Sequence, residues 1–257
     1  MKSPLKFFAL VFLFSLPFWV LGAFSGRLSS TLPVNLPVSA LMFICPAAAA
    51  LLLVRSEAGS DGVRALLRRA VDYRRIPHWL WYLPIIGLMP LVMLLSYGLL
   101  RLLDMPLPEP QLRLELVAIL LLVFLFSAAC EQIGWTGYVA DPLQERWGVL
   151  RASIVVGVVW ALWHVVPYLQ AGHTLNWVLW QCVATVALRV LIDWIYTGTG
   201  KSVFATILFH AMIDVSTFSF PNNGSGYSPL VTGSLLVVAA AIVAIRWGSA
   251  TLAPQHG

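Results

Sequence analysis

The stretch that decides the fold is LELVAILLLVFLFSAACEQI, residues 114–133, an apolar run that closes on a glutamate. About 20 mostly apolar residues are enough to cross the hydrocarbon core of a bilayer as an α-helix. Glu131 lies near the end of this run, and a charged side chain at the centre of a membrane helix costs about 2.5–3.5 kcal/mol on insertion scales. The run therefore predicts a membrane span. The cost of placing Glu131 in this span indicates a functional or structural role for its carboxylate.

The composition extends this prediction to the whole chain. Its 257 residues are 60% hydrophobic and only 11% charged, so the polar side chains are too few to cover a soluble globule. Similar apolar runs recur along the chain, separated by short polar or Gly/Pro-rich breaks. We predict an all-α, polytopic transmembrane helix bundle of about eight spans, at residues 5–24, 36–54, 79–103, 114–133, 152–170, 177–196, 202–219 and 229–246.

The first run could instead be a secretory signal peptide, because lysines flank its start. It is longer and more aromatic than a typical signal sequence, and no A-x-A-like cleavage site follows it. We expect a retained helix. We find no internal repeat and no linker, so we predict one membrane domain over residues 1–257.

The basic residues predict the orientation of the bundle. Lys and Arg accumulate in cytoplasmic loops, and with the N-terminus inside, twelve of them face the cytoplasm: Lys2, Lys6, Arg55, Arg64, Arg68, Arg69, Arg74, Arg75, Arg146, Arg151, Lys201 and Arg246. Only Arg27, Arg101 and Arg113 face outward. We therefore expect both termini in the cytoplasm of a bacterial plasma membrane. Topology and lipid headgroups account for the net charge of +5, and no nucleic-acid-binding pattern accompanies it.

Two further features have structural interpretations. The basic segment at residues 55–79 has Val63, Leu66, Leu67 and Val71 near helical spacing, so it could be an amphipathic helix on anionic lipid or a solvated loop. The three cysteines all lie in apolar spans, and their odd number implies no disulfide framework.

Six of the ionisable residues inside the predicted spans are the candidates for function. Arg189 and Asp193 are four residues apart on one helix, so we expect them to neutralise one another as a structural ion pair. The other four are Glu131, His164, His210 and Asp214. His210 and Asp214 share one helix face at i and i+4. If three helices converge, these four form a shared site that could bind zinc or activate water.

Three segments in order then resemble a known family. They are EQIGWTGYVADPLQERWG, GVVWALWHVVPYL and TGTGKSVFATILFHAMID, and the chain resembles the CAAX-protease and bacteriocin-processing (CPBP, or Abi) family of intramembrane proteases. The likeness covers about residues 40–215. It implies that Glu131, His164, His210 and Asp214 match the catalytic positions of the family, whose motifs are Glu-Glu-x-x-x-Arg, a central His, and His-x-x-x-Asn/Asp.

The chain departs from that pattern at two positions. Gln132 replaces the second glutamate and Thr136 replaces the arginine. These positions are one helical turn apart, where the family residues could form an ion pair. Because replacing both members of a buried pair can be nearly neutral, we expect a hydrogen-bonded pair here. The opposing hypothesis is a catalytically impaired relative. Coupling between Gln132→Glu and Thr136→Arg would decide between them.

The resemblance implies peptide-bond hydrolysis in the membrane. Glu131 and His164 could take a proton from an attacking water, and His210 could stabilise the oxyanion. Ionised Asp214 would repel that oxyanion, so Asp214 must be protonated, orient His210 or bind a metal. The aspartate favours a metalloprotease with zinc held by some combination of Glu131, His164, His210 and Asp214, although water activated without metal stays an alternative.

Other function classes remain open. Intramembrane Glu, Asp and His also mark proton-coupled transporters, which would be expected to show repeated halves. A non-enzymatic membrane scaffold could bind a peptide in the same place. The substrate is a peptide or membrane protein that the sequence does not specify. One geometric difficulty also arises, because the predicted spans put Glu131 and His164 several ångströms apart in depth at about 1.5 Å per residue. A tilted helix or an extended fourth span would close that gap.

Overall fold

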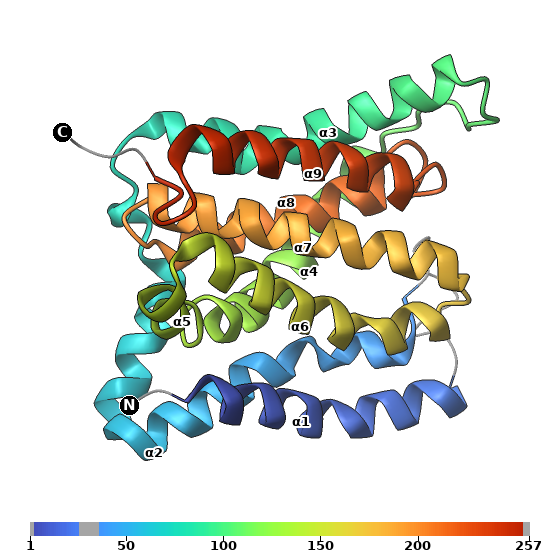
Figure 1. Cartoon of the computed structure of the whole chain (residues 1–257). Coiled ribbons are helices and arrows are strands. Elements are labelled where there is room, and N and C mark those ends of the chain that lie inside the picture. The colour runs from blue at the N-terminus through green and yellow to red at the C-terminus, as the bar shows by residue number, and fades with distance from the viewer. Residues whose placement is uncertain (1–2, 26–35, 254–257) are drawn as a thin grey trace.

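The structure is a computed structural model that describes residues 3–25 and 36–253, and Figure 1 shows a bundle of long helices lying side by side. Lys2 and Arg27, two of the charges used for orientation, lie outside the described residues. The helices are α1 (Pro4–Ser25), α2 (Cys45–Arg68), α3 (Tyr82–Leu102), α4 (Leu114–Trp135), α5 (Ala140–Trp147), α6 (Val149–Gln170), α7 (Leu175–Gly198), α8 (Val203–Ser219) and α9 (Pro229–Trp247). Short 3-10 helices span Val38–Ile44, Arg69–Val71, Tyr73–Arg75 and Trp79–Trp81.

The predicted membrane bundle is confirmed. Seven segments of the described chain are long and apolar enough to cross a bilayer, and α8, with 17 residues, is a shorter apolar helix between two of them. Together these eight correspond to the eight predicted spans. The start of α1 and the end of α9 lie at the same end of the bundle, on the left of Figure 1. This protein is an integral membrane protein.

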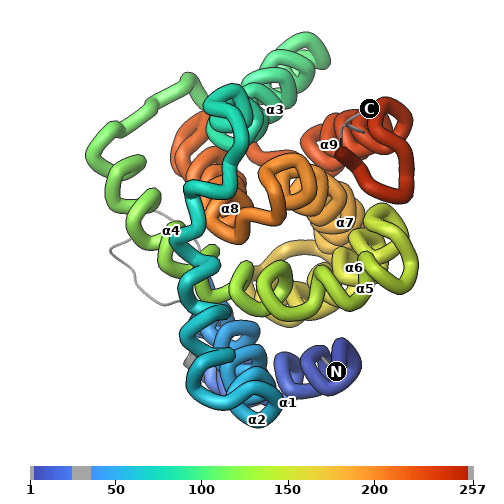
Figure 2. Tube along the Cα trace, turned by 90° about the vertical axis from the view of Figure 1, so that its left-hand side faces the viewer, coloured from blue at the N-terminus to red at the C-terminus, as the bar shows by residue number. Residues whose placement is uncertain are grey.

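Helices α4, α7 and α8 form the centre of the bundle. Helix α4 packs against α2 and α8, and α7 packs against α6, α8 and α9. In Figure 2, which looks along the bundle, α8 lies between α3, α4 and α7, while α1 and α2 form the lower edge. Helices α4 and α8, which carry three of the four candidate residues, are therefore neighbours in space, and α6, which carries His164, packs on α7 beside them.

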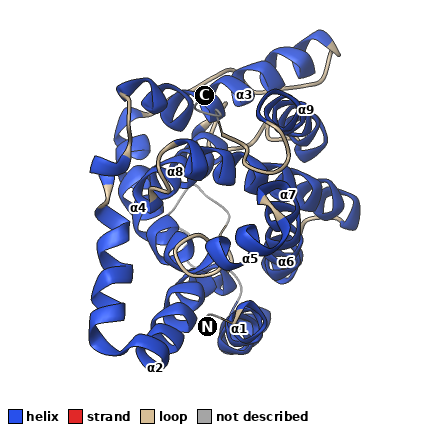
Figure 3. Ribbon diagram, turned by 60° about the vertical axis from the view of Figure 1, so that its left-hand side comes forward, coloured by secondary structure: helices blue, strands red, loops and turns tan. Residues whose placement is uncertain are grey.

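The basic segment 55–79 is helical over most of its length, since α2 continues to Arg68. Gly59 bends this helix, because its φ of 64° lies in the left-handed region. Figure 3 shows α2 as two arms that meet at a sharp bend near its label. Leu66 is buried but Leu67 and Val71 are exposed. The apolar residues at helical spacing in this segment thus partly pack α2 against the protein.

The region between the fourth and fifth predicted spans differs from the expected loop. Helix α4 ends at Trp135 inside the protein, and residues 131–140 are buried without interruption. The chain then continues through α5, which the sequence did not predict, before α6 begins at Val149. Helix α4 is thus two residues longer than the predicted span, and Glu131 lies about one turn before its end. Glu131 and His164 nevertheless share a neighbour, since the Trp160 indole bonds the Glu131 carboxylate and its ring lies 5.6 Å from the His164 ring.

A polar cluster fastens α5 at one end of the bundle. Asp141 forms ion pairs with Lys201 at 3.0 Å and with Arg69 at 3.6 Å. Tyr196 donates its hydroxyl to the same carboxylate and contacts the Arg69 guanidinium. Burial would raise the pKa of Asp141, but Lys201 and Arg69 outweigh burial and hold this pKa below its usual value. The cluster ties α5 and α7 to the 3-10 helix that follows α2.

The start of α8 is fixed by Asp72, which precedes it by about 130 residues. The Asp72 carboxylate accepts from the Ser202 hydroxyl at 2.7 Å and from the backbone N–H of Phe204 at 3.1 Å. Ser202 in turn caps the helix by accepting from the N–H of Ala205. A carboxylate is stabilising at this positive end of a helix dipole. These contacts set the rotation of the helix that carries His210 and Asp214.

We expect Gly134→Ala to destabilise the protein by about 1–3 kcal/mol, the usual cost of overpacking. A Cβ at Gly134 would lie 2.6 Å from the Pro46 carbonyl oxygen, so α2 and α4 would have to separate next to Glu131. Thermal unfolding in detergent measures the effect. Gly98→Ala on α3 is the matched control, because no atom lies within 4 Å of its added Cβ. Equal melting temperatures for the two variants would contradict the close packing.

Candidate active site

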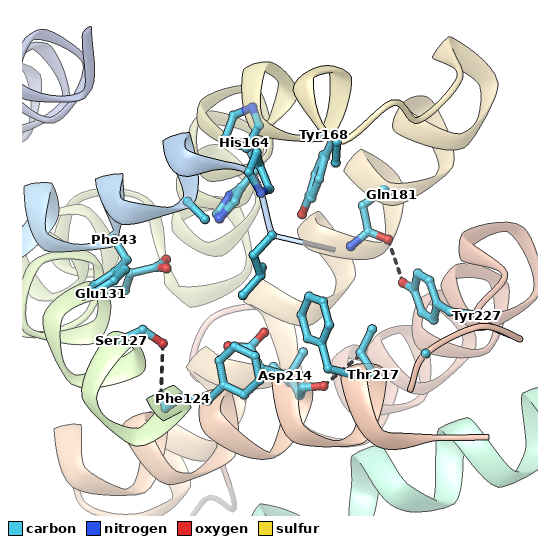
Figure 4. A pocket seen from close by; sticks show the side chains of 18 of the residues that line it. Phe43, Phe124, Ser127, Glu131, His164, Tyr168, Gln181, Asp214, Thr217 and Tyr227 are labelled. Carbon is cyan, nitrogen blue, oxygen red and sulfur yellow. Dashed lines mark hydrogen bonds between the residues drawn. The ribbon is translucent and has the colours of Figure 1, made fainter. Parts of the chain in front are cut away.

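A cavity of about 540 Å³ opens inside the bundle, with candidate residues from three helices on its wall. Glu131 of α4, His164 of α6 and Asp214 of α8 all line it, and Figure 4 shows them around one space. Most of the remaining lining is apolar or aromatic, including Leu41, Phe43, Val123, Phe124, Tyr168, Trp177 and Phe218. An apolar cavity with a few converging polar groups is the usual form of a binding or active site.

Glu131 is buried, with 6% of its surface exposed, and it has a specific partner. The indole N–H of Trp160 donates to Oε2 of Glu131 at 2.8 Å. A buried carboxylate is costly unless it is hydrogen-bonded, and this bond joins α4 to α6. It also fixes the direction in which the carboxylate points.

Trp160 is a site residue that the sequence reasoning missed. Its ring lies 5.6 Å from the His164 ring and 5.2 Å from the His210 ring, edge-on to both. One side chain therefore contacts Glu131, His164 and His210. The available signal was its position one helical turn before His164, on the same face of α6.

His164 is held in one orientation by its own helix. Its Nδ1 lies 2.9 Å from the Trp160 carbonyl oxygen, and its ring stacks on Tyr168 at 5.6 Å. A carbonyl oxygen can only accept, so Nδ1 carries the proton. In the neutral imidazole Nε2 then carries the lone pair. His164 is thus configured to accept a proton at Nε2.

His210 and Asp214 lie one turn apart on α8, as their spacing predicted. His210 Nε2 is 3.7 Å from Oδ2 of Asp214, which is longer than a hydrogen bond. Asp214 reaches the cavity, whereas His210 is buried at 4% exposure and is not among the lining residues. His210 therefore lies buried one helical turn before Asp214.

The two positions that depart from the family motif are hydrogen-bonded to each other. The Thr136 hydroxyl donates to Oε1 of Gln132 at 2.5 Å, and Nε2 of Gln132 lies 2.9 Å from Nδ1 of His210. Both residues are fully buried. Gln132 therefore connects α4 directly to a candidate catalytic histidine.

The expected Arg189–Asp193 ion pair is confirmed, and it has a further partner. Arg189 donates to both carboxylate oxygens of Asp193, at 3.1 and 2.6 Å, and both side chains are buried. Its Nη1 also reaches Oε1 of Gln132 at 3.4 Å. The ion pair, which we predicted to be structural, is thus also hydrogen-bonded to Gln132 beside the candidate active site.

The four candidates do not form a metal site of the usual kind. Over residues 3–25 and 36–253, no three His, Cys, Asp or Glu side chains come close enough together to hold an ion. Nδ1 of each imidazole is hydrogen-bonded within the protein, an arrangement that metal-ligating histidines also show. The three cysteines are free and belong to no such group. Zinc binding by these residues stays a prediction.

Comparison with known proteins identifies the same part of the chain. Residues 113–216 match the family model described as "Type II CAAX prenyl endopeptidase Rce1-like", and this range contains all four candidates. The chain is also 30% identical over 132 residues to CAAX prenyl protease 2 of Methanococcus maripaludis. The resemblance to the CAAX protease family is confirmed. That alignment covers 48% of this chain and 48% of the relative, so the chain spans about half the length of the curated relative it matches.

Proposed function

We propose that this chain is an intramembrane endopeptidase that hydrolyses a peptide bond with a water activated by Glu131 and His164. The observation that carries the proposal is the shared cavity, which Glu131, His164 and Asp214 line from three different helices. All three lie in the segment that matches the CAAX protease family. A proton-relay transporter would not need such a cavity walled by family protease residues.

The proposed chemistry begins when the water oxygen attacks the scissile carbonyl carbon. The Glu131 carboxylate, aimed by Trp160, takes the proton from this water, and Nε2 of His164 is the second acceptor on that side. The C–N bond then breaks, and the proton passes to the leaving amine nitrogen. A positioned acid–base group of this kind contributes about 10²–10⁴-fold to a rate.

His210 and Asp214 act on the opposite side of the substrate carbonyl in this proposal. Protonated Asp214 donates a hydrogen bond to the oxyanion, and His210 supports it from one helical turn before Asp214. Gln132 and Thr136 are supporting residues, because Thr136 donates to Gln132 and Gln132 contacts the His210 imidazole. Their hydrogen bonds favour an active enzyme over an impaired relative, because the motif positions that lost their charges have gained partners.

The substrate class follows from the lining and from the relative. The cavity walls are mainly apolar, which suits a peptide that approaches from the bilayer and carries an apolar segment or an attached lipid. The printed name of the matched relative makes a prenylated CAAX tail the first substrate to test.

A comparison of membrane proteomes tests the proposal without assuming a substrate. Cells carrying wild-type protein are compared with cells carrying Glu131→Gln, and new peptide termini that depend on the carboxylate are sought. The enzyme predicts such termini in the wild type alone. A membrane scaffold predicts identical termini in both, and that result would reject the protease.

We expect cleavage to survive removal of metal ions. The proposed water activation uses only carboxylate and imidazole groups, and the described side chains form no three-ligand cluster. The purified protein is dialysed against a chelator, its metal content is measured, and cleavage is assayed before and after zinc is restored. Loss of activity with the metal, and recovery with zinc, would overturn the metal-free mechanism.

We expect Asp214→Asn to keep cleavage within about tenfold of wild type and Asp214→Ala to lose about 10²–10³-fold, as when one oxyanion donor is removed. An asparagine amide can donate to an oxyanion as a protonated aspartate does, whereas alanine cannot. Initial rates at one substrate concentration below KM measure both. If asparagine is as damaging as alanine, the donor role of Asp214 is wrong.

A further inference from the structure

A hydrogen-bonded chain runs from α7 through α4 to α8. Asp193 holds Arg189, Nη1 of Arg189 reaches Oε1 of Gln132, and Nε2 of Gln132 meets Nδ1 of His210. The four side chains are buried, with exposures of 0–4%. Three helices thus share one polar connection that ends on an imidazole of the candidate site.

Arg189 determines which way the Gln132 amide faces. A guanidinium group can only donate, whereas a side-chain amide has one end that donates and one that accepts. If the amide were reversed, its NH₂ group would meet the guanidinium N–H, and two donors would face each other without an acceptor. Thr136 cannot decide the matter alone, because a hydroxyl both donates and accepts. Asp193 keeps Arg189 in place by binding it with two hydrogen bonds.

This orientation fixes the proton on His210. With its amide nitrogen toward the imidazole, Gln132 donates to Nδ1, so Nδ1 must carry the lone pair and Nε2 the proton. We infer that Arg189 and Asp193 are positioning residues that act through Gln132 to hold His210 as the Nε2–H tautomer, with this N–H toward Asp214 and the oxyanion side. The inference rests on the proposed function for its catalytic meaning.

Gln132 is the residue that determines which ring nitrogen of His210 carries the proton. A glutamate at position 132, as in the family motif, could only accept, so it would draw a proton onto Nδ1 of His210. Gln132 therefore selects the opposite proton position from the one that a carboxylate would select. The departure from the motif is thus a change in the proton position of His210.

The two histidines of the site consequently differ. His164 carries its proton on Nδ1 and presents a lone pair at Nε2, because the Trp160 carbonyl accepts from it. His210 is held the other way by Gln132. One imidazole is set to accept a proton and the other to donate a hydrogen bond, as a water-activating side and an oxyanion side require.

Nitrogen NMR of the full-length protein, labelled at its histidine rings, tests the inference without any cleavage assay. Protonated and lone-pair ring nitrogens have well-separated ¹⁵N shifts, and the His210 signals are assigned by their loss in His210→Gln. We expect wild type to show an unprotonated Nδ1 at His210. Gln132→Glu should move that signal to the protonated position, whereas Arg189→Met combined with Asp193→Leu should produce a mixture of the two tautomers.

Two controls complete the experiment. Arg189→Lys keeps a pure donor and should preserve the wild-type His210 signal, which a variant that only loosens packing would not do. Arg101→Gln, in an exposed ion pair with Glu109, should change nothing. A protonated Nδ1 in wild type would overturn the inference, and so would an unchanged His210 signal in the Arg189/Asp193 double variant. If the double variant does not fold, a wild-type signal in Gln132→Glu overturns it instead. The expected tautomers without any peptide cleavage would reject the proposed function alone.

Discussion

Glu131→Gln lowers peptide cleavage by about 10²–10⁴-fold in our expectation, the range for removing a positioned general base. Glutamine keeps the shape of the side chain, and its amide oxygen can still accept from the Trp160 indole. The substitution therefore removes the base and leaves the α4–α6 contact in place. The decrease should appear in kcat, because the proton is transferred in the chemical step.

The measurement is the rate of cleavage of a peptide identified by the proteome comparison, with purified protein in lipid vesicles. Glu109→Gln is the matched control, since Glu109 is 78% exposed in an ion pair with Arg101 and is not among the residues that line the cavity. It should cleave at the wild-type rate. If Glu131→Gln cleaves as fast as this control, Glu131 is not the base.

Arg189→Met should have the largest effect on stability, a loss of about 3–5 kcal/mol. The substitution leaves the Asp193 carboxylate buried at 1% exposure without its bidentate partner. The double variant Arg189→Met/Asp193→Leu should regain most of that loss, because replacing both members of a buried pair by apolar groups is often neutral or stabilising.

Unfolding in detergent, by heat or denaturant, measures both variants against wild type. Arg101→Gln removes one member of an exposed pair and should cost at most about 1 kcal/mol. Equal stability of the single and double variants at Arg189 would contradict the uncompensated-charge argument. The double variant should nevertheless cleave more slowly than wild type, since it no longer orients Gln132.

Helical periodicity along the chain was sufficient to predict part of the candidate site. His210 and Asp214 lie on one face of α8 because i and i+4 always do on an α-helix, and the same rule placed Arg189 beside Asp193. Their position inside apolar spans then grouped Glu131, His164 and Asp214, which the structure brings to one cavity. Such local rules need no knowledge of how helices pack.

Contacts between different helices could not be predicted from spacing along one helix. Trp160 lies one turn before His164 on the same helix, and this spacing does not reveal its hydrogen bond to Glu131, 29 positions away. Arg189 was assigned to Asp193 alone, although it also reaches Gln132 across 57 positions. The predicted loop after residue 133 is instead a buried turn followed by α5, because amphipathic or short segments give weak hydropathy signals even where tertiary packing encloses them.

The sequence by itself determined a polytopic helical membrane protein and its candidate residues, because bilayer crossing demands long apolar helices and makes every buried charge conspicuous. Only the tertiary structure decided how those residues work together. Which nitrogen of His164 or His210 carries a proton depends on whether its neighbour donates or accepts, and those neighbours are fixed by helix packing and side-chain orientation. The carboxylate in LELVAILLLVFLFSAACEQI is thus marked by sequence, while its direction is set by an indole on another helix.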